Sequence, residues 1–247
     1  MAARCRFWVW ESTKPSVRTK WNRRSLMLQM PAIVSLIPLL FTKMKTVSDA
    51  GSRHYQVQEM ISLHENMDTA QRIGDVEDSF NRSLERLGLD YVDLYLIHWP
   101  VPGCYTDTWK ALEKLQSQGR VKSIGVSNFH IHDLEMLKKI SDVVPAVNQI
   151  EFHPLFNQPE LLSYCRDNKI AVQAYAPLAR GAYLHSQLLL EIGRKYQKTT
   201  AQIGLRWAVQ QGISVIPKSV HKERIQENAG IFDFSLYRGR DGSHNCY

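Results

Sequence analysis

Residues 91–99 read YVDLYLIHW, and Pro100 follows them. β-Branched, aromatic and aliphatic residues fill most of this run, which predicts a strand buried on both faces and typical of a parallel sheet covered by helices. His98 and Trp99 stand at its C-terminal tip. In a barrel of parallel strands, polar residues at such tips carry out the chemistry. His98 is therefore a candidate catalytic residue, and the alternative is a histidine satisfied within the core.

Four more strands are predicted at regular intervals downstream, and each also ends in polar residues. They read VKSIGVSNF (residues 121–129), AVNQIEFHP (146–154), IAVQAYAPL (170–178) and SVIPKS (214–219). Helix start signals are expected at Asp133 and Ser186, and stop signals at Gly119 and Gly212.

Apolar residues recur with helical periodicity before and between these strands. The stripes are Val76, Phe80, Leu84 and Leu87; Trp109, Leu112 and Leu115; Leu134, Leu137 and Ile140; Leu161, Leu162 and Cys165; and, in the longest interval, Leu188, Leu189 and Ile192, then Ile203 and Trp207. A strand followed by a helix, repeated five times, predicts βαβ units and an α/β fold with a parallel sheet.

Five motifs in this order and spacing resemble the aldo-keto reductase family. They are LGLDYVDLYLIHWP (87–100), GVSNF (125–129), VNQIEFHP (147–154), AYAPLAR (174–180), and IPKS with RIQEN (216–219 and 224–228). The resemblance covers residues 75–236. It implies a (β/α)8 TIM-type barrel in which the five strands are the fourth to the eighth. It also implies an NADPH site at the C-terminal rim and the reduction of aldehydes or ketones to alcohols.

The nicotinamide end of such a cofactor needs its carboxamide held and its ring kept flat. Ser127, Asn128 and Gln149 carry donors and acceptors that suit a carboxamide, and the family uses the matching positions for this purpose. Tyr175 matches the residue on which the family stacks the nicotinamide ring, and the resemblance also places Leu178 at the cofactor. The alternatives are that Asn128 caps a turn and that Tyr175 is a core aromatic.

The last predicted strand leads into a second group of polar residues. Lys218, Ser219 and Arg224 combine two cations and a hydroxyl near a helix start, a combination that suits a phosphate. The family binds the 2′-phosphate of NADP here and contacts adenine at the positions of Glu227 and Asn228. NADP(H) is therefore the expected cofactor, and a solvated surface charge pair is the alternative for Lys218 and Arg224.

The upstream part of the family's active site is not found in order. The family pairs its histidine, matched by His98, with an aspartate, a proton-donating tyrosine and a lysine. The stretches LLFTK (39–43) and DAGSRHYQ (49–56) are faint echoes of these regions in reversed order, which leaves Lys43 and Tyr55 as weak candidates. In register, the aspartate position holds Gln56 and the tyrosine position holds Ile61.

Two functions from different classes stay open on this sequence. One is an NADPH-dependent carbonyl reductase that uses His98, with Trp99 lining the substrate pocket. The other is a catalytically impaired NADP-binding barrel with a structural or sensing role. A phenol and an ammonium group within reach of His98 would separate them.

The chain divides by composition into three parts. Residues 1–67 form an atypical basic segment, 68–236 the barrel portion and 237–247 a polar tail. The first 45 residues carry nine Lys or Arg and one acid, a net of +8 against +7 for the whole chain. This head is compatible with an import peptide, a signal anchor, a nucleic-acid arm or an altered start. The uncharged run 26–41 is shorter than the roughly 20 residues of a membrane span.

The remaining observations concern the cellular compartment and the binding partners of the protein. Four scattered cysteines without a C-x-x-C pair argue against a zinc site and a disulfide framework, and fit a reducing compartment. We expect a cytoplasmic monomer that acts on a small carbonyl compound without a metal or a nucleic-acid partner, with targeting by the basic head left open.

Overall fold

The computed structural model describes residues 60–61, 71–72 and 74–237. The chain forms two compact units, which are described separately. The first contains residues 1–127 and 135–145, and the second contains residues 128–134 and 146–247. Helix α5 (Ile131–Ile140) contributes residues to both.

The first unit alternates strands and helices, as predicted. Its elements are β1 (Met60–Ile61), α3 (Val76–Leu87), β2 (Val92–Ile97), α4 (Tyr105–Ser117) and β3 (Val121–Ser127). The strands lie in the order β1-β2-β3 and are parallel, with Ile61 opposite Tyr95 and Ile97 opposite Val126. Every residue of β2 is buried, which agrees with a strand covered on both faces.

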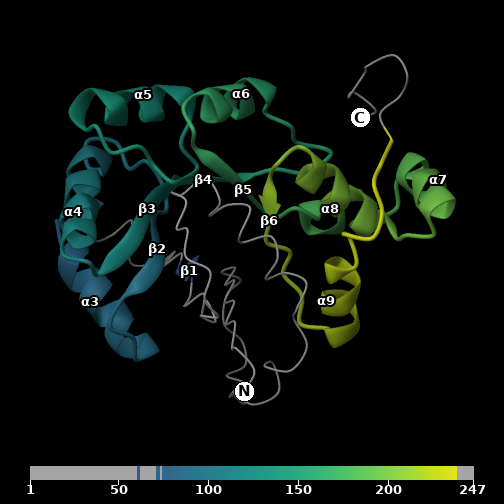
Figure 1. Ribbon diagram of the computed structural model, residues 1–247, viewed down its shortest axis with the longest axis horizontal. Helices are drawn as coiled ribbons and strands as arrows, with labels where there is room; N and C mark the ends of the chain where they lie inside the picture. The colour runs from purple at the N-terminus through teal and green to yellow at the C-terminus, as the bar shows by residue number, and fades with distance from the viewer. Residues whose placement is uncertain (1–59, 62–70, 73, 238–247) are drawn as a thin grey trace, which may run out of the picture. The chain divides into compact units, whose positions relative to one another are not determined.

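Helices α3 and α4 lie beside β2 and β3 (Figure 1). The stripe predicted on α4 is buried completely, at Trp109, Leu112 and Leu115. Gly119 ends this segment with a φ of +73°, a conformation that glycine adopts without steric cost. The predicted stop signal is therefore confirmed.

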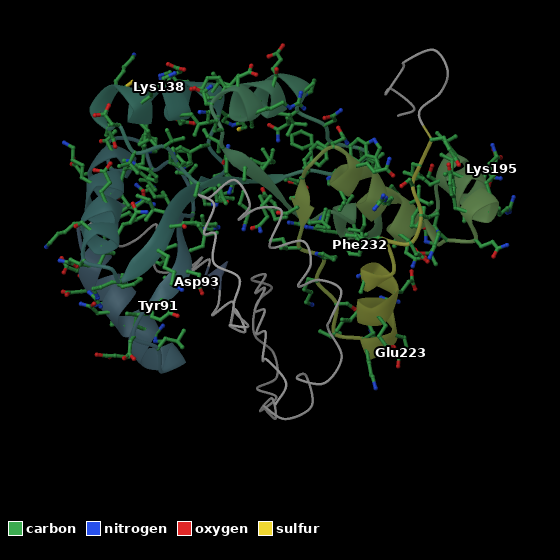
Figure 2. All side chains as sticks on the ribbon, viewed as in Figure 1. Tyr91, Asp93, Lys138, Lys195, Glu223 and Phe232 are labelled. Carbon is green, nitrogen blue, oxygen red and sulfur yellow. The ribbon has the colours of Figure 1, made fainter. Side chains whose placement is uncertain are left out.

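One charged pair fixes the beginnings of β2 and β3 to each other. Lys122 Nζ lies 2.6 Å from Asp93 Oδ1 and 4.4 Å from the centre of the Tyr91 ring. Figure 2 shows Tyr91 and Asp93 together at this end of β2. Burial opposes protonation of Lys122, but the hydrogen bonds to Asp93 and Tyr91 outweigh it and raise the pKa of the ammonium group.

The second unit repeats the alternation. It contains β4 (Val147–Glu151), α6 (Pro159–Asp167), β5 (Ala171–Tyr175), a short 3-10 helix η2 (Ala179–Gly181), α7 (Gln187–Tyr196), α8 (Thr200–Gln210), β6 (Ser214–Val215) and α9 (Lys222–Ala229). The strands lie in the order β4-β5-β6 and are parallel. The parallel α/β class predicted from the sequence is confirmed in both units.

The hydrophobic core of the second unit includes a cluster under α7 and α8. Tyr183, Leu189 and Ile203 are its buried members. Phe152 and Trp207 stack face to face with ring centres 4.9 Å apart. These contacts bury Leu189 and Ile203 of the predicted stripes, whereas Leu188 is 47% exposed.

The predicted strand ends and the predicted start of α5 differ from the structure, whereas α7 begins where Ser186 predicted. The strands are shorter than the quoted runs because the polar residues at their tips form loops. Helix α5 begins two residues before Asp133, whose carboxylate instead accepts the His130 backbone N–H at 3.0 Å. Ser186 is the N-cap residue of α7, but its side chain makes no capping hydrogen bond. Across the described ranges, no helix is long and apolar enough to span a membrane.

Candidate functional site

The predicted cofactor residues of the second unit lie at one edge of its sheet. Because β4, β5 and β6 are parallel, their C-terminal ends meet at the same edge. Glu151 lies opposite Tyr175, and the Ile216 N–H donates to the Ala174 carbonyl at 3.2 Å. The chain that carries Lys218 and Ser219 therefore leaves the sheet beside Tyr175.

Asn128 is held at this edge by its backbone and by its side chain. Its N–H donates to the Gln149 carbonyl at 2.8 Å, and its Oδ1 accepts the Tyr175 hydroxyl at 2.8 Å. Its φ is +62°, a left-handed conformation that asparagine tolerates better than most residues. The structure thus brings together Asn128, Gln149 and Tyr175, which the sequence predicted as a group.

The Gln149 side chain is buried and has a specific partner. Its Nε2 donates to Gln173 Oε1 at 2.7 Å across the β4–β5 pair, where the two residues are in register. Gln173 was not predicted from the sequence, although its position two residues before Tyr175 places both on one face of β5. Gln173 fixes the orientation of the Gln149 amide.

The loop after Tyr175 carries Leu178 and is conformationally strained. Ala176, Ala179 and Arg180 have φ values of +45°, +47° and +52°, which are unfavourable for residues with a Cβ. Beneath the loop, the Tyr183 hydroxyl donates to the Pro177 carbonyl at 2.8 Å. Leu178 packs against the cluster that contains Tyr183, so packing from below holds the loop in place.

The predicted phosphate group of residues stands on and before α9. The Ser219 hydroxyl accepts the His221 N–H at 3.1 Å, next to the start of the helix. Lys218 and Arg224 are exposed. Within the described ranges, neither has an ion-pair partner.

Glu227 and Asn228, the predicted adenine contacts, lie near the C-terminal end of α9. Asn228 is buried. Glu227 Oε1 accepts the Thr199 hydroxyl at 2.6 Å, which connects α9 to the N-cap residue of α8. The sequence analysis did not foresee this contact, although the spacing of Thr199 and Gln202 is that of a capping box.

The first unit contains the other three predicted residues. His98 directly follows β2 and is half-buried, and its ring centre lies 5.9 Å from that of Trp99 at an interplanar angle of 73°. Trp99 is 46% exposed, and its carbonyl accepts the Gln71 Nε2 at 3.2 Å. Ser127 is buried at the end of β3, on the same edge as the tip of β2.

The weak upstream candidates Lys43 and Tyr55, together with Gln56, lie outside the described residues. So do the basic head (residues 1–45), the run 26–41 and residues 238–247. The backbone of Ile61 belongs to β1. Among the residues that the structure describes, no three His, Cys, Asp or Glu side chains gather to hold a metal ion.

Comparison with known proteins extends these findings. Residues 39–238 match the Aldo/keto reductase family. Glyoxal reductase of Bacillus subtilis is 52% identical over 158 residues, which are 64% of this chain and 57% of the relative. The 9,11-endoperoxide prostaglandin H2 reductase of Trypanosoma cruzi is 50% identical over 161 residues, with coverages of 64% and 57%. The chain thus spans little more than half the length of these relatives.

Solved structures of aldo-keto reductases are also similar to this chain. The aldo/keto reductase of Brucella melitensis is 48% identical, with a TM-score of 0.67, covering 71% of this chain and 68% of its own. A Bombyx mori aldo-keto reductase in complex with NADP is 37% identical, with a TM-score of 0.62 and coverages of 66% and 60%. The family match covers most of the chain and includes every predicted site residue, so this chain belongs to the aldo/keto reductase family.

Proposed function

We propose that this protein reduces aldehyde or ketone carbonyls to alcohols with NADPH. The observation that carries the proposal is the group formed by Asn128, Gln149 and Tyr175 at the C-terminal edge of the β4–β5 pair. The Asn128 side chain bonds to the Tyr175 hydroxyl at 2.8 Å, and its backbone bonds to Gln149 at 2.8 Å. Two amide side chains and a phenol ring are thereby gathered on one edge.

The residues present fit the chemical parts of NADPH. The amide side chains of Asn128 and Gln149, with the Ser127 hydroxyl, suit a carboxamide because they offer both donors and acceptors. The Tyr175 ring offers a flat aromatic face to the nicotinamide. When bound, NADPH supplies the hydride that reduces the carbonyl carbon.

Selectivity for NADPH over NADH rests on the phosphate end. Lys218 and Arg224 are exposed cations near the start of α9, and a guanidinium binds a phosphate through two parallel hydrogen bonds. The Ser219 hydroxyl adds a further donor. Leu178 on the strained loop, and Glu227 and Asn228 on α9, complete the proposed set of cofactor contacts.

His98 is the proposed polar residue for the substrate. A neutral imidazole N–H can donate a hydrogen bond to a carbonyl oxygen and stabilise the negative charge that develops on it. Trp99 is proposed to contact the organic part of a small carbonyl substrate. The related glyoxal and prostaglandin H2 reductases carry out reductions according to their names, which supports this class of activity.

The test is NADPH oxidation with a general aldehyde such as nitrobenzaldehyde. The proposal predicts loss of NADPH absorbance that depends on both enzyme and aldehyde, with formation of the alcohol. A His98→Ala variant should bind NADPH normally and reduce the aldehyde at least tenfold more slowly. Absence of turnover and of NADPH binding in the full chain would refute the proposal.

A second candidate, an NADP-binding protein with impaired catalysis, predicts a different result. It is favoured by Ile61, which stands where the upstream echo of the family pattern calls for a tyrosine. NADPH would then quench tryptophan fluorescence without any aldehyde reduction.

We also propose that the protein is a cytoplasmic monomer. Its chain is proposed to divide into the basic segment (residues 1–67), the barrel portion (68–236) and the polar tail (237–247). Cys104 and Cys165 are both free thiols, as suits a reducing compartment. Sedimentation of the full chain would test the monomer, and a dimer mass would refute it.

A further inference from the structure

The chain that leaves α9 runs along α8 and bonds to a row of side chains, of which three are on α8 and one, Lys198, lies just before it. We call residues 230–237 the C-terminal strap. Figure 1 shows α9 and the strap beside α8, and Figure 2 marks Glu223 near one end of α9 and Phe232 beyond the other. The residues that bond to the strap recur at every fourth position, at Lys198, Gln202, Arg206 and Gln210.

Each member of this row bonds to the strap. Lys198 Nζ donates to the Gly230 carbonyl at 3.3 Å and to Asp233 Oδ2 at 2.6 Å. Arg206 donates to the Ile231 carbonyl at 3.1 Å and to the Ser235 hydroxyl at 2.8 Å, and Gln210 Nε2 donates to the Leu236 carbonyl at 3.0 Å. Gln202, Arg206 and Gln210 lie four apart on one face of α8, so the helix presents a polar edge to the strap.

Gln202 is the member that also holds α9 itself. Its Nε2 donates to the Glu227 carbonyl at 2.9 Å and to the Gly230 carbonyl at 3.0 Å. Its Oε1 accepts the Thr199 N–H at 3.0 Å. The side chain is buried, so these bonds are shielded from water.

Thr199 makes a second connection to α9. Its hydroxyl accepts the Gln202 N–H at 3.3 Å, which completes the capping box of α8, and donates to Glu227 Oε1 at 2.6 Å. The capping box thus holds the end of α9 as well as the start of α8.

Helix α9 depends on these contacts for its position. It has only eight residues, and isolated helices of that length are not stable in water. The Glu227 carbonyl at its C-terminal end accepts the Gly230 N–H at 3.0 Å, and the Gln202 amide adds a second donor at 2.9 Å. Loss of Gln202 would remove two hydrogen bonds that hold the C-terminal end of α9, and the Thr199–Glu227 bond would remain.

We infer that Gln202 is a positioning residue for the NADP phosphate end of the cofactor, and that it acts through α9. Helix α9 carries Arg224, the proposed ligand of the 2′-phosphate, and Glu227. Gln202 is not among the proposed cofactor contacts. The inference rests on the proposed function, because Gln202 is assigned to the same site as a residue that holds a proposed cofactor ligand in position.

The test compares Gln202→Met with Gln211→Met in the full chain. Met is close to Gln in shape but cannot donate. Gln211 lies at the end of the same helix and is exposed, and its side chain donates to the Trp207 carbonyl within α8. The measurements are the Kd of NADPH and of NADH by fluorescence quenching, and kcat for nitrobenzaldehyde at saturating NADPH.

We expect Gln202→Met to raise the Kd of NADPH at least fivefold and the Kd of NADH by a clearly smaller factor, because both nucleotides share the proposed adenine contacts on α9 but only NADPH carries the 2′-phosphate. The kcat at saturating NADPH should stay within twofold of wild type, and Gln211→Met should match wild type throughout. A NADPH Kd within twofold of wild type in Gln202→Met would overturn the inference. So would an equal loss for both nucleotides, because a general structural defect would not discriminate between them.

A second pair of variants covers the case in which Gln202→Met does not fold. Thr199→Val removes the hydroxyl bond to Glu227, whereas Thr199→Ser keeps it. We expect the ratio of the NADH Kd to the NADPH Kd to be smaller in Thr199→Val than in wild type. In Thr199→Ser this ratio should equal that of wild type. Equal preferences in the two variants would contradict the inference.

The wild-type titration separates this inference from the proposed function. If wild type does not bind NADPH, the proposed function fails and takes the inference with it. Suppose instead that wild type binds NADPH and that Arg224→Met weakens this binding. If Gln202→Met then binds NADPH as tightly as wild type, only the positioning role of Gln202 is refuted.

Discussion

The Tyr175 hydroxyl donates a hydrogen bond to Oδ1 of Asn128 at 2.8 Å, across 47 positions in the sequence. The bond joins the end of β5 to the first residue of the second unit. It holds an aromatic face and an amide side chain at one edge of the sheet, which is what a nicotinamide ring and its carboxamide need. Tyr175 thus has a polar partner as well as an aromatic surface.

Removing this bond tests whether Asn128 and Tyr175 act together. Tyr175→Phe keeps the ring but loses the donor, and a hydrogen bond contributes roughly 0.5–1.5 kcal/mol. We expect the Kd of NADPH to rise about 2- to 10-fold in a fluorescence titration. Tyr237→Phe, at a residue that is 90% exposed, should leave the Kd unchanged. Identical affinities in wild type and Tyr175→Phe would show that the bond does not position the cofactor.

Arg224 should determine the preference for NADPH. Hydrogen bonds to charged groups contribute roughly 1.5–3 kcal/mol, so Arg224→Met should raise the Kd of NADPH about 10- to 100-fold. NADH lacks the 2′-phosphate, and its Kd should stay nearly constant. The control is Arg166→Met on α6, an exposed arginine at the end of another helix. Equal losses for NADPH and NADH would place the 2′-phosphate elsewhere.

The contact between Gly204 and Tyr183 should make a normally favourable substitution destabilising. Alanine in place of a glycine within a helix ordinarily stabilises by about 1 kcal/mol. A Cβ on Gly204 would overlap the Tyr183 hydroxyl and come within 2.6 Å of the ring carbon that bears it. Overpacking of this kind costs about 1–3 kcal/mol, so Gly204→Ala should lower the free energy of unfolding in urea. A more stable Gly204→Ala variant would contradict this packing.

Cys165 should be unreactive in the folded protein at neutral pH. Burial raises the pKa of its thiol to about 11, from 9.0, although a hydrogen bond from Asn148 acts in the opposite direction. At pH 8 we expect iodoacetamide to label Cys104 before Cys165, and to label Cys165 readily only in urea. Peptide mass spectrometry reads this order, and rapid labelling of native Cys165 would refute it.

The same raised pKa predicts how stability depends on pH. Above about pH 9 the unfolded thiol loses its proton while the folded thiol keeps it, so the unfolded state binds fewer protons and stability falls as pH rises. The contribution should be complete below pH 9 and lost by about pH 11. In Cys165→Ala this part of the pH dependence of unfolding should disappear, and its persistence would assign it to other groups.

The strands and helices could be predicted because their hydrophobic patterns are long and local. The run of residues 91–99 predicts a strand buried on both faces. The stripe of Trp109, Leu112 and Leu115 predicts which face of a helix is buried. Strand β1 could not be predicted, because two residues carry no periodicity. Its pairing depends on β2.

The site was predicted less completely, because sequence patterns indicate residue types but not their partners. Asn128, Gln149 and Tyr175 were expected together, yet Gln173 was missed because its bond to Gln149 crosses two strands. The positive φ values of Ala176 and Arg180 have no local signal either. They follow from packing that only the fold supplies.

The most direct test of carbonyl reduction follows the hydrogen atom itself. Wild type would be incubated with nitrobenzaldehyde and with NADPH that carries two deuterium atoms at C4 of the nicotinamide, and the alcohol would be analysed by mass spectrometry. Our account predicts deuterium on the alcohol carbon in proportion to the NADPH consumed. Alcohol without deuterium, or NADPH binding with no alcohol at all, would contradict it.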